Sequence, residues 1–340
     1  MGKVLWALFL PLSCLYWLGL QIGNTVYAIG WKRPRTLNAF VLSIGNLTVG
    51  GAGKTPTVVW FAQELQKRGF KVVVLSRGYK RKGKEPLVLD ANLVADVMDG
   101  GDEPSMMARV YGLTVAVAKS RYQAAREVLQ TASVDVFLLD DGFQHRQLGR
   151  DLDVLLLGTD SAGWLLPCGP FREPRRAMRR ADLLLVTGAR ENWQRVIPKD
   201  ANRSSYHGSL QPLALVGFEL QHSKEYPLSL LAGSKIVAVT AIANPEPFYH
   251  MVYEWDGEIR DSFEFPDHHN YSAHDWQRIN RAALNADLIV TTEKDILKLI
   301  RFPFAREKLL ALRVAMVVEN GDALIRRVVD LIDQKSSREH

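Results

Sequence analysis

The chain has 340 residues and a small positive excess, with 43 Lys and Arg against 37 Asp and Glu and a formal net charge of +6. This length predicts about two domains, each large enough to bury a core, and the 47% hydrophobic content argues against a disordered chain. Two cysteines, Cys14 and Cys168, are too few for a disulfide framework and indicate a reducing compartment. The mean hydropathy of −0.08 argues against a polytopic membrane protein, and the positive charge indicates an anionic partner.

A strongly apolar N-terminal segment is hidden by this average. No charged residue lies between Lys3 and Lys32, and residues 4–20 are almost entirely apolar. As a helix, residues 4–20 would reach about 25 Å, short of a hydrocarbon core of about 30 Å, so the uncharged continuation to Trp31 would be needed to complete a span. The sequence leaves open a spanning helix, a half-inserted helix and a buried core helix.

Basic residues follow this apolar segment, at Lys32, Arg33 and Arg35. A cleaved signal peptide carries its positive charges before the apolar run, so this order argues against one. By the positive-inside tendency, the basic cluster keeps the rest of the protein on the cytoplasmic side. We therefore expect residues 1–35 to anchor the chain at a membrane.

Short apolar runs alternate with helix-compatible segments from Phe40 onward, which predicts a parallel α/β sheet with crossovers. A less regular stretch at about 198–212 separates two series of runs, so we expect one α/β domain over residues 36–212 and a smaller one over 213–340. The expected strands are Phe40–Ile44, Val72–Leu75, Leu113–Val117, Val134–Leu139, Val154–Leu157 and Leu183–Val186, then Ile236–Thr240, Ile259–Phe263, Leu288–Thr291 and Ala311–Val318.

A glycine-rich segment follows the first expected strand and precedes a helix-compatible run. Its backbone N–H groups and the helix N-terminus suit phosphate oxygens, Lys54 can reach the β- and γ-phosphates of a nucleotide, and Thr55 can bind Mg²⁺. The usual first glycine of such a phosphate loop is replaced by Thr48, and an ordinary glycine turn is the alternative. The predicted loop comprises Thr48, Val49, Gly50, Gly51, Ala52, Gly53, Lys54 and Thr55.

Paired carboxylates end the apolar run at Val134–Leu139, where Asp140 and Asp141 precede a glycine. A phosphate loop usually needs an acidic partner at the end of a neighbouring strand to hold its metal ion. An Asp-Gly turn is the structural alternative. Because the pair comes after a phosphate loop, we predict that at least one of the two carboxylates faces Mg²⁺.

Two weaker patterns could supply a general base. Asp102 lies in the segment Asp-Gly-Gly-Asp-Glu-Pro, where capping of a helix is the more common purpose of an aspartate. His268 lies beside His269 in the second domain, and adjacent histidines without further ligands do not make a zinc site. A histidine from one domain that orients an aspartate from the other would form a base dyad between the domains.

Two further segments concern recognition. Residues 171–180 carry arginines that would share one face of a helix beginning at Pro174, and such a face suits a phosphorylated substrate or an anionic bilayer. The segment lacks the aromatic residues interleaved with basic ones that are typical of a single-strand nucleic-acid binder, so we expect no nucleic acid partner. Residues 291–295 approach the guanine-reading pattern, but Ile296 stands where that pattern needs an aspartate, so guanine specificity is unsupported.

Seven segments in this order resemble the tetraacyldisaccharide 4′-kinase family, and the resemblance extends from the N-terminal segment to about residue 325. It implies a P-loop NTPase-like α/β fold and an ATP- and Mg²⁺-dependent kinase of lipid A biosynthesis on the cytoplasmic face of the inner membrane. The implied reaction phosphorylates the 4′-hydroxyl of an acylated glucosamine disaccharide 1-phosphate to give lipid IVA. The segments are Gly45–Pro56, Ser76–Tyr79, Gly101–Pro104, Asp140–His145, Leu166–Pro174, Pro266–His268 and Thr292–Asp295.

The resemblance also implies residue roles and partners. The partners are the lipid acceptor and an anionic membrane surface, and the sequence identifies no protein partner. Asp102 and His268 would form the base dyad, Lys54 and Thr55 would bind the nucleotide and Mg²⁺, and Asp140 and Asp141 would lie on the metal side. Arg172 and Glu173 would lie near the lipid or the metal, and Glu293, Lys294 and Asp295 would contact the adenine side of the nucleotide.

A hypothesis from another class is a membrane-associated nucleotide switch or partitioning NTPase. Such a protein would hydrolyse ATP without a lipid acceptor and would dimerise with nucleotide. A deviant phosphate loop of that kind commonly has a lysine near the position of Val49, and the valine counts against this hypothesis.

Overall fold

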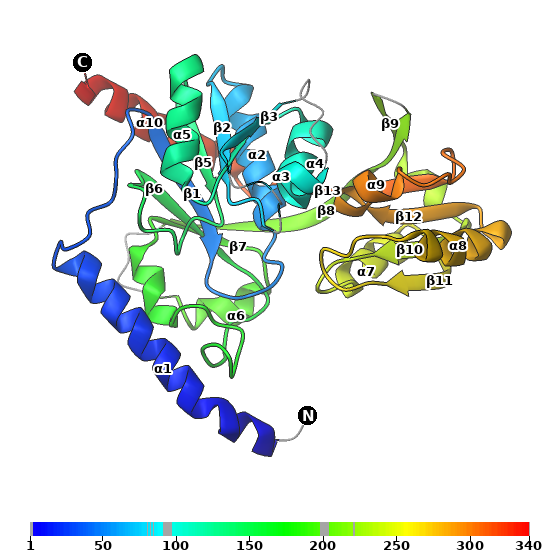
Figure 1. The fold of residues 1–340 in the computed structure, drawn as a ribbon, viewed down its shortest axis with the longest axis horizontal. Helices are drawn as coiled ribbons and strands as arrows, with labels where there is room; N and C mark the ends of the chain where they lie inside the picture. The colour runs from blue at the N-terminus through cyan, green and yellow to red at the C-terminus, as the bar shows by residue number, and fades with distance from the viewer. Residues whose placement is uncertain are drawn as a thin grey trace.

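A curled, mostly parallel sheet of thirteen strands organises the part of the chain that this computed structural model describes, residues 3–79, 81, 83, 85–90, 97–197, 204–219 and 222–339 (Figure 1). All ten strands expected from the sequence are confirmed. The strands are β1 (Phe40–Asn46), β2 (Val72–Ser76), β3 (Leu87–Leu89), β4 (Thr114–Val117), β5 (Val136–Asp140), β6 (Leu152–Leu157), β7 (Leu183–Val186), β8 (Ser204–Glu219), β9 (His222–Tyr226), β10 (Lys235–Thr240), β11 (Glu258–Glu264), β12 (Leu288–Thr292) and β13 (Leu309–Val318).

Helices cover both faces of the sheet. Strands β1, β2, β5, β6 and β7 are buried along their whole lengths, which explains why their sequences are continuous apolar runs and not alternating ones. The helices are α1 (Lys3–Ala28), α2 (Lys54–Gln66), α3 (Val97–Gly100), α4 (Asp102–Tyr111), α5 (Arg121–Thr131), α6 (Arg190–Gln194), α7 (Glu246–Glu254), α8 (Ala273–Ala282), α9 (Glu293–Leu299) and α10 (Gly321–Glu339), with short 3₁₀ turns η1 (Arg175–Arg180), η2 (Leu228–Leu231) and η3 (Ala283–Asn285).

Two long strands join two α/β parts. The first part contains β1–β7, and the second contains β9–β12 with α7, α8 and α9 (Figure 1). Strand β8 pairs in parallel with β7 through residues 204–207 and then antiparallel with β13 through residues 208–216. The expected boundary between residues 212 and 213 therefore lies inside one continuous strand, and α10 returns to pack against α2 of the first part.

The expectation of an irregular stretch at 198–212 is wrong from Ser204 onward, and residues 198–203 lie outside the described residues. The strand was not predicted because the segment contains Pro212, and proline is uncommon inside a sheet. The β8–β13 register shifts beside it, where Val314 pairs with Pro212 and Arg313 with Ala214, which leaves Leu213 as the extra residue of a bulge.

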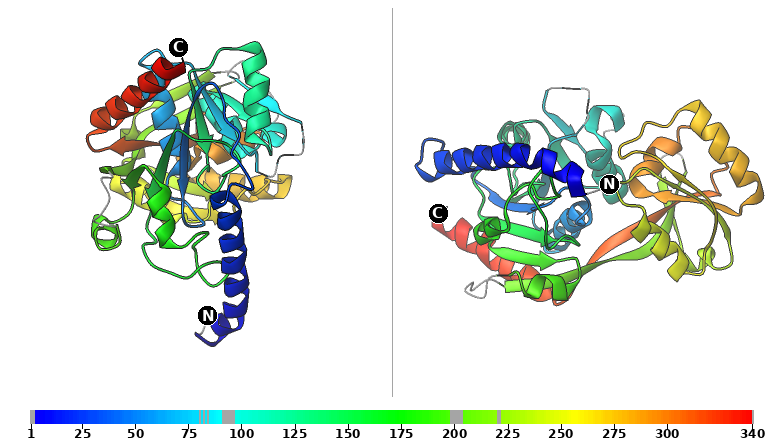
Figure 2. Two further views of the ribbon diagram at one scale, coloured as in Figure 1. Left: turned by 90° about the vertical axis from the view of Figure 1, so that its left-hand side faces the viewer. Right: turned by 90° about the horizontal axis from the view of Figure 1, so that it is seen from below.

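Helix α1 lies on the outside of the first part, and its N-terminal end projects from the body (Figure 2). Ser13 is buried against the segment that follows Trp164, where its hydroxyl donates to the carbonyls of Leu165 and Leu166 at 3.1 Å. Among the helices that the structure describes, none combines the length and apolar character that a membrane crossing needs. The expectation of a buried core helix is wrong, because apolar side chains of α1 face outward: Phe9, Leu10, Leu12, Leu15, Trp17, Leu18 and Ile22.

The arginine-rich segment forms the 3₁₀ turn η1 where the sequence suggested an α-helix from Pro174. Arg175, Arg176 and Arg179 are exposed, whereas Arg180 turns inward and pairs with Glu173. The expected single face of four arginines is therefore reduced to three exposed cations.

We expect Gly45→Ala to destabilise the protein, because an added Cβ would lie 2.7 Å from the Cβ and 2.8 Å from the backbone nitrogen of Phe143. Neither neighbour can move without shifting the loop after β5, so the free energy of unfolding should fall by about 1–3 kcal/mol in urea denaturation. Gly51→Ala is the control, since its Cβ would meet nothing within 4 Å. Equal unfolding midpoints for the two variants would contradict this close packing.

Candidate active site

The carboxyl ends of neighbouring parallel strands bring the predicted phosphate loop and acidic pair together. Strand β1 pairs with β5 so that Ile44 lies opposite Asp140, and β2 pairs with β5 on its other side. The glycine-rich loop follows β1, Asp140 is the last residue of β5, and Asp141 comes directly after it. The sequence therefore predicted both the elements and the edge of the sheet at which they meet.

The predicted phosphate loop is fixed by backbone contacts at its first residues and is exposed to solvent where it turns. Thr48 is buried and bridged to Phe171, and the backbone nitrogen of Val49 donates to the carbonyl of Pro170 at 2.7 Å. Gly50 and Gly53 have φ angles of 107° and 76°, which glycine adopts without strain. The chain curls there with residues 49–51 exposed, so their backbone groups are accessible to an anion.

Lys54 begins α2 and points toward the acidic pair. Its ammonium group donates to the side-chain oxygen of Asn46 at 3.2 Å and lies 3.7 Å from a carboxylate oxygen of Asp141. Thr55 follows in the first turn and is half-buried. A cation and a hydroxyl thus lie beside the loop, as the sequence predicted.

The two aspartates have opposite electrostatic environments. Burial, together with the nearby Glu103 and Asp141, raises the pKa of Asp140 to about 7. Burial also raises the pKa of Asp141, but the cations of Lys54 and Arg172 outweigh it and hold that pKa below its usual value. Arg172 donates to both oxygens of Asp141, at 2.8 and 3.0 Å.

This donor set fits Mg²⁺ of the kind that binds with a nucleotide. Across the described ranges, no cluster of three or more His, Cys, Asp and Glu side chains is arranged to hold a metal ion. Mg²⁺ usually takes only one or two carboxylates and completes its shell with phosphate oxygens and water. Asp140 is 5% exposed and is repelled by two neighbouring carboxylates, so a divalent cation at this place would relieve an existing repulsion.

The two parts of the predicted base dyad meet across the chain. His268, in the loop after β11, contacts Asp102 at the start of α4, with 3.0 Å between Nδ1 and Oδ2. The capping alternative is wrong, because Gly101 is the N-cap residue and no side-chain cap is present. Burial raises the pKa of Asp102, but hydrogen bonds from His268 and Lys298 prevail and lower it to about 2, so the carboxylate is ionised at neutral pH.

Glu103 connects this dyad to the phosphate loop, and the sequence analysis did not single it out. Burial raises the pKa of Glu103, while Lys294, His268 and Lys54 oppose the rise. Its electrostatic neighbours therefore come from both halves of the predicted site. Its position directly after Asp102 in the Gly-Asp-Glu-Pro segment was the available signal.

Arg172 and Glu173 lie near different features. Arg172 pairs with Asp141, as described above. Glu173 is buried and accepts two hydrogen bonds from Arg180, at 2.6 and 3.0 Å. It also lines a cavity of about 390 Å³ between α1 and the segment after β5, together with Tyr16, Gly19, Leu20, Gly23, Asn24, Tyr27, Gln144 and Arg146.

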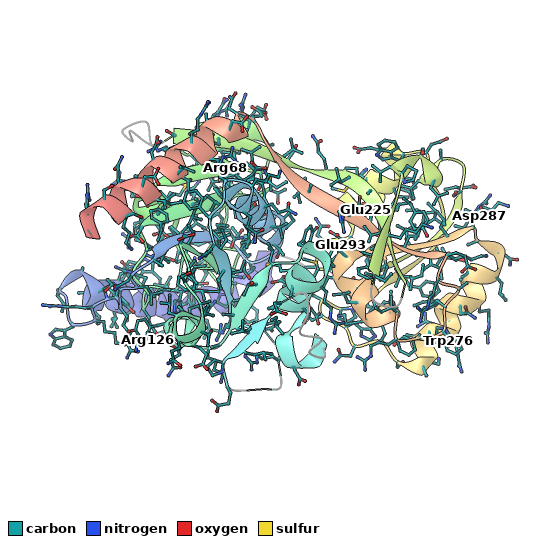
Figure 3. All side chains as sticks on the ribbon, turned by 90° about the horizontal axis from the view of Figure 1, so that it is seen from above. Arg68, Arg126, Glu225, Trp276, Asp287 and Glu293 are labelled. Atoms are coloured by element: carbon teal, nitrogen blue, oxygen red, sulfur yellow. The ribbon has the colours of Figure 1, made fainter. Side chains whose placement is uncertain are left out.

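The three residues predicted for the adenine side have contacts within the protein. Glu293 accepts from the Tyr111 hydroxyl at 2.6 Å and from Arg313 at 2.9 Å, and Figure 3 shows it at the junction of the two parts near Glu225. Lys294 donates to Asp267 at 2.7 Å. Asp295 is fully buried and accepts from the backbone nitrogen of Ala241 and the hydroxyl of Thr292.

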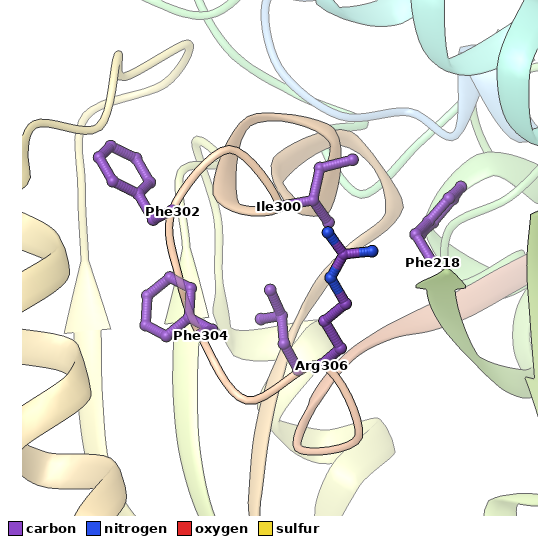
Figure 4. A pocket seen from close by; sticks show the side chains of 6 residues that line it. Phe218, Ile300, Phe302, Phe304 and Arg306 are labelled. Atoms are coloured by element: carbon purple, nitrogen blue, oxygen red, sulfur yellow. The ribbon is translucent and has the colours of Figure 1, made fainter. Parts of the chain in front are cut away.

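A second hollow in the second part is too small for a substrate. It lies under the loop after α9 and is lined by Phe218, Ile300, Phe302, Phe304, Arg306 and Leu309 (Figure 4). Its volume of about 10 Å³ holds about one water molecule.

Comparisons with known proteins agree with these features. The family model for tetraacyldisaccharide-1-P 4′-kinase matches residues 5–333. The tetraacyldisaccharide 4′-kinase of Syntrophus aciditrophicus is 40% identical over 310 residues, which cover 84% of this chain and 82% of the relative. The enzyme of that name from Aquifex aeolicus is 33% identical over 321 residues, covering 93% and 95%.

A solved structure matches nearly the whole fold. The crystal structure of LpxK from Aquifex aeolicus, described as an apo form in complex with ATP, superposes with a TM-score of 0.80 at 32% sequence identity. The match covers 96% of this chain and 99% of that one. The large, mostly parallel sheet is therefore common to both proteins.

We expect Asp140→Asn to stabilise the metal-free protein, and more so as pH rises. The native pKa of Asp140 is raised to about 7, whereas the unfolded chain ionises an aspartate near pH 4. Ionisation therefore destabilises the native state, by an amount that grows from about pH 4 to pH 7 and is constant above that. Urea unfolding with chelator should give the variant an advantage on the order of 1–3 kcal/mol at pH 8 and a smaller one at pH 5.

Asp322→Asn serves as the control, because the Asp322 side chain is 84% exposed. Its stability relative to the original protein should be the same at both pH values. An Asp140→Asn variant without this pH-dependent advantage would contradict the buried repulsion between the carboxylates.

Proposed function

The chain belongs to the tetraacyldisaccharide-1-P 4′-kinase family, and from this premise we propose how its residues perform the reaction of a lipid A kinase. The γ-phosphate of ATP passes to the 4′-hydroxyl of an acylated glucosamine disaccharide 1-phosphate, which gives lipid IVA and ADP. One observation carries the assignment of the site: His268 and Asp102 meet at 3.0 Å although they are 166 residues apart in the chain. Glu103, the residue after Asp102, is acted on electrostatically by both His268 and Lys54 of the phosphate loop.

The nucleotide phosphates bind on the loop Thr48–Thr55. Exposed backbone groups at Gly50 and Gly51 donate to the anion beside Val49, whose own nitrogen is held by the carbonyl of Pro170, and Ala52 and Gly53 lead into α2. Lys54 lies 3.7 Å from Asp141, so it moves from that carboxylate to the β- and γ-phosphates when ATP enters. Phosphoryl transfer needs positioning and charge neutralisation more than covalent chemistry, and this loop supplies both.

Thr55, Asp140 and Asp141 are the residues that would hold Mg²⁺. Bound there, the ion would neutralise the negative charge of the transferring phosphate. Arg172 holds Asp141 through two hydrogen bonds and fixes the direction of its carboxylate. The positive charges of Lys54 and Arg172 keep Asp141 ionised and ready to accept a cation.

Asp102 takes the proton from the 4′-hydroxyl of the acceptor as the new O–P bond forms. A sugar hydroxyl is a poor nucleophile, and removal of its proton in the transition state speeds the reaction. His268 orients the carboxylate through its 3.0 Å contact. Residues 36–212 supply the phosphate loop and Asp102, and residues 213–340 supply His268. Because His268 already contacts Asp102, the smaller domain closes over the nucleotide with the dyad assembled.

The segment Glu293–Asp295 borders the adenine side of the nucleotide. Lys294 is held by Asp267 and acts electrostatically on Glu103, which places its charge toward the site. Asp295 accepts from the Thr292 hydroxyl at 2.7 Å, and Thr292 caps the first turn of α9 by accepting from the backbone nitrogen of Asp295. Glu293 and Asp295 thus fix the segment through contacts within the protein, and Lys294 is the residue of the three that faces the nucleotide.

The acceptor lipid approaches from the side of α1. The 390 Å³ cavity beside Glu173 has room for part of a sugar headgroup, and its lining combines the polar Asn24, Gln144 and Arg146 with apolar residues of α1. Arg172 lies between this cavity's rim at Glu173 and the acidic pair. The headgroup therefore reaches the phosphate loop along residues 172–173.

Helix α1 holds the protein against the cytoplasmic face of the inner membrane. Its outward apolar side chains, such as Leu15 and Ile22 at 64% and 58% exposed, suit the boundary between headgroups and acyl chains. Exposed basic residues from two segments suit anionic lipids, and one of them, Arg176, contacts Gln21 of α1. They are Lys32, Arg33 and Arg35 after α1, and Arg175, Arg176 and Arg179 in η1.

The kinase assay tests the proposed residue roles. We expect the purified protein with ATP, Mg²⁺ and tetraacyldisaccharide 1-phosphate to form a bisphosphorylated lipid detectable by mass spectrometry. Asp102→Ala and His268→Ala should lower kcat by about 10²- to 10⁴-fold with little change in KM for ATP, because they remove the base and not the nucleotide site. Lys54→Ala should impair both parameters.

Arg306→Ala is the matched control, because Arg306 is an exposed cation at the small hollow and has no role in the proposed reaction. Unchanged turnover in Asp102→Ala would refute the base assignment. ATP hydrolysis that is independent of the lipid acceptor, with no bisphosphorylated product, would favour the nucleotide-switch hypothesis.

Vesicle flotation tests the membrane surface. The double variant Leu15→Glu and Ile22→Glu should lose most of its binding to phosphatidylglycerol-containing vesicles, because two carboxylates would enter the apolar boundary. Leu284→Glu changes an equally exposed leucine on η3, at 75% exposed, and should bind like the original protein. Equal flotation of all three proteins would contradict anchoring by α1.

A further inference from the structure

Lys298 is a buried cation that neither the sequence motifs nor the proposed chemistry uses. It lies near the end of α9 and is 3% exposed. Its ammonium group donates to Oδ2 of Asp102 at 2.9 Å and to the backbone carbonyl of His269 at 2.8 Å. A buried lysine is costly unless it is paired and hydrogen-bonded, so these contacts give it a defined position.

Lys298 and His268 hold the same atom of Asp102. The Nδ1 atom of His268 lies 3.0 Å from Oδ2, and the Nζ atom of Lys298 lies 2.9 Å from it. Two donors from separate segments therefore fix one carboxylate oxygen from two directions. The other oxygen, Oδ1, receives neither of these bonds. Its direction is set because Lys298 and His268 fix Oδ2.

The Lys298 contact is one of two ties between α4 and α9. Asp102, the first residue of α4, meets Lys298 near the end of α9, and Tyr111, the last residue of α4, donates to Glu293 at the start of α9 at 2.6 Å. The two helices thus run in opposite directions with each end of one fixed to an end of the other. Helix α4 belongs to the first part and α9 to the second, so this pair of ties crosses between them.

We propose that Lys298 is a positioning residue for the base: it fixes Oδ2 of Asp102 so that Oδ1 faces the acceptor hydroxyl, and it makes this orientation depend on the contact between α4 and α9. The proposal rests on the role of Asp102 as the base. It gives α9 a second function. The start of the helix, at Glu293, borders the nucleotide, and Lys298 near its end orients the carboxylate of Asp102.

The charge of Lys298 also keeps the base ionised. The groups acting on Asp102 are His268 from the loop after β11 and Lys298 from α9, which together outweigh its burial; Glu103 is its chain neighbour, and Tyr271 lies within its field. Loss of the Lys298 cation removes one of the two hydrogen bonds that lower the pKa of Asp102. The acid limb of the kcat–pH profile, where Asp102 becomes protonated, then moves to higher pH.

The test is Lys298→Met, which keeps the length of the side chain and removes its charge. We expect kcat to fall about 10- to 100-fold, a part of what a general base contributes, with KM for ATP within about twofold. The acid limb should move upward by about one pH unit or more, the shift produced by losing one close opposite charge. Lys335→Met is the control for loss of a hydrogen-bonded lysine, since Lys335 contacts Asp151 and Ala39 far from the base.

The outcomes separate this proposal from the base assignment. Asp102→Ala that is fully active refutes the base itself, whatever Lys298→Met does. An inactive Asp102→Ala beside a Lys298→Met protein with unchanged kcat and pH profile overturns the positioning proposal alone. A lowered kcat with an unmoved acid limb, or a large rise in KM for ATP, also overturns it, because either indicates a general structural or nucleotide-binding effect.

Thermal melting shows whether Lys298→Met is folded under the assay conditions. Where it is not, Lys298→Arg decides, because arginine keeps the cation and loses the fitted length. A lowered kcat with the acid limb and KM for ATP at their original values supports the proposal. Full kcat with a raised KM for ATP overturns it.

Discussion

The repulsion between carboxylates that are buried close together is the constraint on which the rest of this site depends. Asp140 and Asp141 follow each other at the end of β5, and Glu103 adds its charge to theirs. Lys54 and Arg172 offset this charge at Asp141, and Lys294 and His268 offset it at Glu103. The burial that strengthens every interaction here also makes each unpaired charge costly, so the neighbouring cations stabilise the ionised carboxylates of the folded protein.

The fold meets this requirement by bringing cations from distant segments. The phosphate loop supplies Lys54 from the end of β1, and the loop before η1 supplies Arg172, both within the first part. Lys294 and His268 come from the second part, across the long strands β8 and β13 (Figure 1). Strands β8 and β13 join the two parts along one edge. The hydrogen bonds between α4 and α9 connect the parts a second time, at the site itself.

The sequence predicted the elements whose signal is local. The phosphate loop and the acidic pair each follow an apolar strand, and parallel pairing of β1 with β5 makes their meeting a consequence of topology. The sequence patterns predicted only that a histidine of one domain could orient an aspartate of the other. The family resemblance identified these two residues as Asp102 and His268. The structure brings them within 3.0 Å.

Long-range contacts and irregular backbone escaped the sequence analysis. Lys298 is one lysine among many in the sequence, and only the packing of α9 against α4 brings it to Asp102. Strand β8 was missed because Pro212 interrupts its pattern, and a bulge at Leu213 accommodates that proline. Glu103 was missed because its importance comes from neighbours contributed by four other segments.

One short segment links the outer helix to the phosphate loop. Ser13 and Tyr16 of α1 donate to the carbonyls of Leu165, Leu166 and Arg172. The backbone of this same segment supports the loop, because the carbonyl of Pro170 accepts from Val49 and the nitrogen of Arg172 donates to Leu47.

The side chain of Arg172 then holds Asp141. A displacement of α1 against a bilayer would therefore reach the phosphate loop and the acidic pair through residues 165–172, which include the buried Phe171. In a kinase whose acceptor lies in the membrane, such a connection ties the position of the body at the surface to the geometry of the site.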